Sequence, residues 1–243
     1  MRHLFYIEQN YAFAILRPLQ EAIWQLGHEI KWFLVGDELN RIYLNKNEEE
    51  LSNVMEVMSW KPDVVFAPGN WIPTFFPGFK VALFHGFNVS KATRTDDKGH
   101  FNIRGCFDLY CAQGPNTTTE FIKTAAKHKN FTVRETGWPP LDTMFMKKTP
   151  VVTFRNQSRG DTSHLINVTE QAALETAIEF GLQHPPQIMQ SIDNFIAETH
   201  PYSDGSSSER VINAVLSQIQ SKQKLKRKPL NLIRNFKSLL KLI

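Results

Sequence analysis

Short apolar runs alternate with amphipathic stretches along the first 145 residues of the chain. Each apolar run is too short for a helix and is typical of a buried strand, whereas each amphipathic stretch has apolar side chains at helical spacing. The predicted strands occupy residues 4–7, 30–35, 64–67, 80–84, 109–112 and 132–136. The predicted helices occupy residues 11–26, 48–60 and 117–128. This alternation predicts an α/β fold with a parallel, Rossmann-like sheet.

The pattern changes after residue 145. A predicted strand at residues 150–154 and a short apolar run at 165–168 are followed by predicted helices at 169–182, 185–199 and 206–220. This part has about 70 residues, less than half the size of a usual nucleotide-binding domain. We therefore predict a Rossmann-like domain at 1–145, a reduced second α/β domain at 146–221 and a tail at 222–243.

The tail, residues 222–243, carries the excess positive charge of the chain. It holds eight Lys or Arg and no acid, which leaves 20 basic and 24 acidic side chains in the rest. From residue 232 onward the apolar residues fall on one helical face, opposite Arg234, Lys237 and Lys241. A basic amphipathic helix either binds an anionic membrane surface or packs on the protein itself or on a partner helix. The sequence leaves these interpretations open.

Composition excludes several classes of protein. The chain has no run of about 18 apolar residues and no secretory leader, so we expect a cytoplasmic protein that binds the inner face of the cell membrane at most peripherally. Cys106 and Cys111 lack a metal-ligand spacing, and neither a zinc-binding histidine pair nor a G-x-G-x-x-G fingerprint occurs. We expect no metal and no cofactor. Nucleic acid is not an expected partner, because a short basic tail on an acidic body lacks a stacking platform.

A histidine and a glycine, His85 and Gly86, directly follow the predicted strand at residues 80–84. Open α/β sheets bind ligands beyond the carboxyl ends of their strands. Histidine is also the side chain best suited to act as a general base near neutral pH. His85 is therefore either a catalytic base or a residue that merely ends a strand.

The polar loop after His85 adds His100 and the cations Lys98 and Arg104. Such cations either neutralise a phosphate or are simply solvated. Further on, Gly114 and Asn116 lie at the start of a predicted helix, where backbone N–H groups bind an anion or are only capped.

Several short motifs contain these candidates. They are His85-Gly86, Lys98-Gly-His-Phe-x-Ile-Arg-Gly105, Phe107-Asp-Leu-Tyr110, Gly114-Pro115 and Gly137-Trp-Pro-x-Leu-Asp142. In this combination the chain resembles the CDP-glycerol glycerophosphotransferase family, in its shorter Gram-negative form. Residues 202–210 resemble the Asp-Gly-x-Ser-Ser-x-Arg motif that closes members of that family.

The resemblance implies a GT-B arrangement, with an acceptor-side domain at 1–145 and a donor-side remnant at 146–221. It implies transfer of glycerol phosphate from CDP-glycerol to a glycan or polyol-phosphate acceptor, in surface polysaccharide or teichoic-acid-like synthesis. His85 would be the base that deprotonates the acceptor hydroxyl. The expected substrate-binding residues are Gly86, Lys98, His100, Arg104, Gly114 and Asn116.

The chain departs from that family after residue 145. Judged against a two-domain GT-B chain, about 100 residues that would hold the donor's cytidine diphosphate are missing. Two alternatives therefore stand beside the transferase. The segment at residues 150–157 is similar to that of a UDP-N-acetylglucosamine 2-epimerase-like GT-B enzyme. The other alternative is a non-catalytic remnant that binds an acceptor or a membrane.

Overall fold

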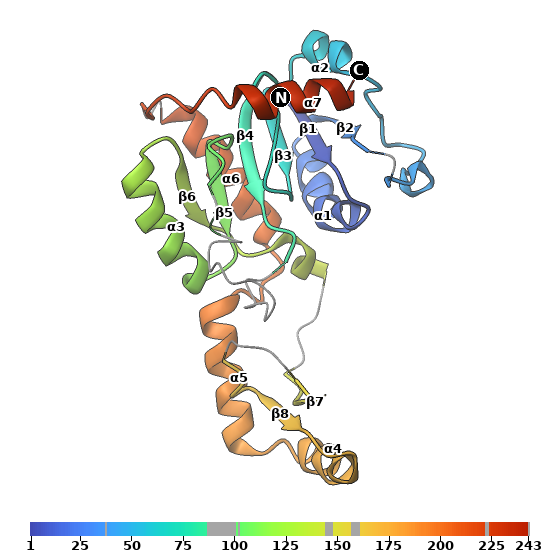
Figure 1. Cartoon of the computed structure of the whole chain (residues 1–243), viewed down its shortest axis with the longest axis vertical. Helices are drawn as coiled ribbons and strands as arrows, with labels where there is room; N and C mark the ends of the chain where they lie inside the picture. The colour runs from blue at the N-terminus through green and yellow to red at the C-terminus, as the bar shows by residue number, and fades with distance from the viewer. Residues whose placement is uncertain are drawn as a thin grey trace.

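A single parallel sheet forms the larger part of the protein (Figure 1). The computed structural model describes residues 1–36, 38–86, 101, 103–143, 148–156, 161–221 and 224–242. The six strands pair in the order β2-β1-β3-β4-β5-β6, and every pair is parallel. They are β1 (Arg2–Ile7), β2 (Glu29–Leu34), β3 (Val64–Ala67), β4 (Phe79–Leu83), β5 (Leu109–Ala112) and β6 (Thr132–Glu135).

Helices cover both faces of this sheet, because alternate strand residues point to opposite faces and both sets are apolar. On one face Phe5 and its neighbours pack with α1 (Tyr11–Gln25) and α6 (Ser207–Gln220). On the other face Leu4 and its neighbours pack with α2 (Val54–Trp60) and α3 (Pro115–His128). The predicted α/β fold with a Rossmann-like sheet is confirmed.

The second, smaller α/β unit projects from the lower end of the first in Figure 1. Its two parallel strands are β7 (Val151–Phe154) and β8 (Leu165–Val168). They pack with α4 (Leu174–Leu182) and α5 (Pro186–Thr199), and α5 leads back to α3 of the larger unit. Short 3-10 helices complete the described elements: η1 (Arg41–Tyr43), η2 (Pro139–Thr143) and η3 (Gln171–Ala173).

Helix α6 belongs to the range 146–221 in sequence but to the larger unit in space. Val211, Ile212 and Val215 are buried in the same apolar cluster as Phe13 of α1. The small unit is therefore an excursion between η2 and α6, and the boundaries drawn from the sequence stay a prediction.

The tail ends in α7 (Leu232–Leu242), which crosses the end of the molecule opposite the small unit (Figure 1). Its polar side chains face the loop between β3 and β4. Trp71 Nε1 donates to Ser238 Oγ at 2.9 Å, and the Thr74 backbone N–H donates to Asn235 Oδ1 at 3.0 Å. Among the described residues, no helix has both the length and the apolar character needed to cross a bilayer.

Candidate functional site

The order of the sheet strands reverses at β1, which lies between β2 and β3. Ligands of open α/β sheets bind beyond the carboxyl ends of the strands at such a point. A cavity of about 80 Å³ lies there, and we call it the switch-point crevice. Its lining residues are Tyr6, Glu8, Gln9, Tyr11, Ala12, Ala67, Pro68, Gly69 and Trp71.

Three polar side chains gather at this edge of the sheet. Glu8 directly follows β1, and its Oε1 accepts a hydrogen bond of 3.1 Å from the Tyr6 hydroxyl. The ring of Tyr11 lies 5.8 Å from that of His85, which is exposed and follows the end of β4. Burial, together with the charge of Glu8, raises the pKa of Tyr11, so its hydroxyl stays protonated. A carboxylate, a phenol and an imidazole are thus available for acid–base chemistry.

The six expected substrate-binding residues occupy three places in the structure. Gly86 is half-buried beside His85, and Arg104 lines a separate cavity that adjoins the crevice. Gly114 and Asn116 lie at the start of α3. Lys98 and His100 lie outside the described residues. The substrate roles assigned to all six stay predictions.

Gly114 has a packing reason to be glycine. A Cβ atom at this position would lie 2.6 Å from the carbonyl carbon of Thr199, the last residue of α5. Asn116 also contacts this end of α5, because its Nδ2 donates to Thr199 Oγ1 at 3.4 Å. The small unit therefore packs closely against the large unit at the start of α3.

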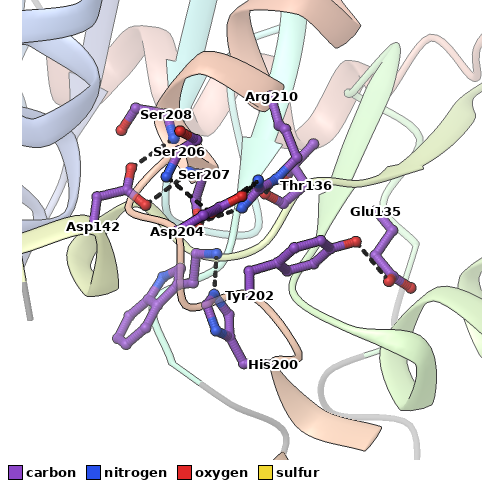
Figure 2. Close-up of polar contacts among 11 residues, drawn as sticks. Glu135, Thr136, Asp142, His200, Tyr202, Asp204, Ser206, Ser207, Ser208 and Arg210 are labelled. Atoms are coloured by element: carbon purple, nitrogen blue, oxygen red, sulfur yellow. Dashed lines mark hydrogen bonds and ion pairs between the residues drawn. The ribbon is translucent and has the colours of Figure 1, made fainter. Parts of the chain in front are cut away.

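Figure 2 shows a second group of polar residues, where the chain returns from the small unit to α6. We call it the closing cluster. Its members are Glu135, Thr136, Asp142, His200, Tyr202, Asp204, Ser206, Ser207, Ser208 and Arg210.

A carboxylate occupies the start of α6 in the closing cluster. Asp142 accepts from the backbone N–H groups of Ser207 and Ser208 at 2.8 and 2.7 Å. These are the donors with which a helix N-terminus binds phosphate. Because Asp142 already holds them, this end of α6 is capped by the chain itself.

The remaining contacts of the closing cluster tie it to β6. Arg210 Nε donates to the Thr136 carbonyl at 2.8 Å, while its NH1 pairs with Asp204 at 2.8 Å. The guanidinium also lies 4.0 Å over the ring of Tyr202. Tyr202 donates to Glu135 at 2.8 Å, and burial is the largest reason that its pKa rises to about 12. These contacts fix the start of α6 against the end of β6 and therefore have a structural role.

A buried histidine links the closing cluster to His85. His200 Nε2 accepts from the Trp138 backbone N–H at 2.9 Å, so that nitrogen carries no proton. Burial lowers the pKa of His200, which agrees with a neutral ring. Trp138 Nε1 in turn donates to the carbonyl of Phe84 at 2.8 Å. The backbone just before His85 is therefore held in place through Trp138.

Sequence reasoning missed Glu8 and Tyr11. The signal was present, because Glu8 follows the first predicted strand just as His85 follows the fourth, and parallel strands bring both ends to one edge. Among the described residues, no group of three or more His, Cys, Asp or Glu could hold a metal ion.

No protein-family model matches the chain, and no curated protein matches its sequence. Among solved structures, a protein described as a UDP-N-acetylglucosamine 2-epimerase from Listeria monocytogenes is 10% identical with a TM-score of 0.46, over 93% of this chain and 98% of that one. The UDP complex of S. aureus MnaA is 12% identical with a TM-score of 0.47, over 93% and 99%. The E. coli heptosyltransferase WaaC with ADP is 12% identical with a TM-score of 0.31, over 66% and 58%. Likeness at this level concerns the fold alone.

The expected membership of the CDP-glycerol glycerophosphotransferase family is wrong. No family model of that kind matches, and the similar structures are named as a UDP-N-acetylglucosamine 2-epimerase, MnaA and a heptosyltransferase. The predicted transfer of glycerol phosphate from CDP-glycerol depended on this resemblance and is wrong with it. The prediction that a donor segment is missing depended on it too. The motif letters have a structural explanation, because Asp142 and Arg210 belong to the closing cluster.

Proposed function

We propose that the chain is an enzyme acting on a nucleotide-linked sugar, and that the reacting sugar binds at the switch-point crevice. The observation that carries this proposal is the convergence of Glu8, Tyr11 and His85 at the carboxyl edge of the sheet. Glu8 and His85 are suited to exchange protons with a sugar carbon or hydroxyl, and Tyr11 to donate a hydrogen bond. The crevice alone is small, so the nucleotide would extend beyond it.

UDP-N-acetylglucosamine is the first substrate to test, since the Listeria protein is named for it. Epimerisation at C2 breaks a C–H bond and forms a new one with a solvent proton. We therefore expect the purified chain in D₂O to produce the C2 epimer with deuterium at that carbon, measured by NMR. Turnover is expected to fall about 100-fold in His85→Ala and in Glu8→Gln, because each removes an acid–base group.

The matched control is Glu29→Gln, which makes the same change at the amino end of β2. It is expected to leave turnover unchanged. Binding of the sugar nucleotide without any product would contradict the enzymatic proposal and favour a binding protein. Equal losses in Glu8→Gln and Glu29→Gln would contradict the proposed location of the site.

We also propose that α7 rests on an anionic membrane surface. Its polar face is engaged by Trp71 and Thr74, whereas several of its apolar side chains are exposed. Leu232, Ile233 and Phe236 are 62 to 75% exposed. The neighbouring segment at residues 224–228 supplies basic side chains, and such cations attract anionic lipids.

Binding to vesicles tests this placement of α7. The full chain is expected to co-sediment with vesicles of phosphatidylserine and phosphatidylcholine, and less with phosphatidylcholine alone. Phe236→Ser is expected to weaken binding about tenfold, because a large apolar side chain no longer enters the lipid. Ile122→Ser is the control, since Ile122 is 54% exposed on α3. Equal binding of both variants, or self-association of the chain without vesicle binding, would contradict the proposal.

A further inference from the structure

A second cavity lies between α7 and the sheet, and we call it the tail cavity. It encloses about 240 Å³ and is lined by Tyr6, Glu8, Val35, Trp71, Arg104, Arg234, Lys237 and Ser238. Since Tyr6, Glu8 and Trp71 also line the switch-point crevice, the two cavities adjoin each other. A cavity needs only about 10–15 Å³ of such volume to admit a water, so the tail cavity has room for a small polyatomic anion.

Three cations from distant parts of the chain line the tail cavity. Arg104 precedes β5, whereas Arg234 and Lys237 come from α7. Glu8 is the single acid among the lining residues that the structure describes. The lining therefore carries an excess of positive charge.

Within the described parts of the chain, no ion pair includes Arg104, Arg234 or Lys237. Among the same described residues, the Nε of Arg104 has no hydrogen-bond partner, and it is shielded from solvent. Like charges gathered at one cavity repel each other, and a buried N–H group without a hydrogen bond costs free energy. A bound anion would relieve both costs.

The tail is held in the position that completes this lining. Asn231 Nδ2 donates to the carbonyl of Arg104 at 2.9 Å, and Ser238 accepts from Trp71. The guanidinium of Arg234 lies 5.8 Å from the centre of the Trp71 ring, a cation–π contact at the rim of the cavity. Among the described residues, Arg234 and Lys237 make none of the hydrogen bonds that hold α7, so their charge is available to a ligand.

We propose that the tail cavity binds a phosphate or diphosphate group, with Arg104, Arg234 and Lys237 as its cationic ligands. Arginine forks and lysine point charges are the side chains that recognise phosphate oxygens. The phosphate comes either from a soluble nucleotide whose sugar lies in the adjoining crevice, or from a lipid at the surface on which α7 rests. Only this choice of source rests on the proposed function, because the cavity and its charges do not depend on the reaction.

Inorganic pyrophosphate is the probe that tests the site itself. Isothermal titration calorimetry with the full chain is expected to show saturable binding that weakens as salt is added. Arg234→Gln and Lys237→Gln are each expected to weaken binding about tenfold, the loss of one charge-assisted contact. Lys224→Gln is the matched control, because Lys224 belongs to the same tail but not to the cavity lining, and it is expected to bind like the wild type.

Competition identifies the source of the phosphate. Displacement of pyrophosphate by UDP supports the nucleotide, whereas displacement by phosphatidic acid vesicles but not by phosphatidylcholine vesicles supports the lipid. Absence of pyrophosphate binding by the wild type, or equal weakening by Lys224→Gln and Arg234→Gln, overturns the proposal. Sugar-nucleotide turnover without pyrophosphate binding overturns this inference alone, and pyrophosphate binding without turnover overturns only the proposed reaction.

Discussion

The Gly114→Ala substitution is expected to lower the free energy of unfolding by about 3 kcal/mol relative to the wild type. This is the upper part of the range for overpacking. The added methyl group would meet the backbone of Thr199 and lie 3.1 Å from the N–H nitrogen of His200. Backbone atoms at a helix end cannot rotate away as a side chain can. The end of α5 must therefore move from the start of α3, which disturbs the contact between the two units.

Urea unfolding followed by circular dichroism measures this change. Gly69→Ala is the matched control, because among the described residues its added methyl group would meet only Glu8 Oε2, at an ordinary distance of 3.8 Å. It is expected to change the free energy of unfolding by less than about 1 kcal/mol. Equal stabilities of Gly114→Ala and Gly69→Ala would show that α5 does not press on α3 in solution.

Acidification is expected to destabilise the fold through His3. This ring is buried in β1, 5.9 Å from Phe66 and 5.1 Å from His28 between ring centres. Burial, and next the nearby His28, lower the pKa of His3 from 6.5 to about 4. Between these values the unfolded chain binds a proton that the folded chain does not, so stability falls as the pH decreases. The loss approaches about 3 kcal/mol once the pH reaches the folded pKa.

Comparison of variants isolates this contribution. Urea unfolding at pH 6.5 and at pH 4 gives the loss of stability for the wild type and for His3→Phe, which keeps an aromatic ring but has no proton to gain. The variant is expected to lose less stability than the wild type over this interval. His128→Phe, which replaces an exposed ring at the end of α3, is the control. An equal reduction of the pH dependence in both variants would contradict the role of His3.

The sheet could be predicted from the sequence because its signal is local. Each strand is a short apolar run, and both faces of the sheet are buried, so the runs stand out from the amphipathic helices. The placement of α6 could not be predicted in this way. Its apolar stripe shows that Val211 and Val215 are buried, but not which sheet buries them.

The packing of the tail also could not be predicted from the sequence. Periodicity correctly places Phe236 and Asn235 on different faces of a helix, but it does not say which face meets the protein. Here the polar face does, through Asn235 and Ser238, because the loop at Trp71 and Thr74 offers hydrogen bonds. The tail cavity depends on this choice and was therefore beyond the sequence.

Motif letters misled the functional reading for a physical reason. Gly137 has a φ of 79°, and a Cβ there would lie 2.5 Å from Ser207 Oγ, so backbone conformation and packing both favour glycine. Asp142 is required to cap α6. A motif built from such residues indicates how α6 packs against the end of β6. It carries no information about the substrate. His85 differs, because the strand-end rule that singled it out concerns ligands.

The position of α6 has a consequence for synthesis of the protein. The face of β1, β3 and β4 that carries Phe5 is completed only by Val211 and its neighbours, which are made after the entire small unit. At the usual rates of translation, roughly 4 to 17 seconds separate the end of β6 from the end of α6. During that interval the nascent sheet exposes apolar surface, so a chaperone that binds such surface would meet this chain before it can fold.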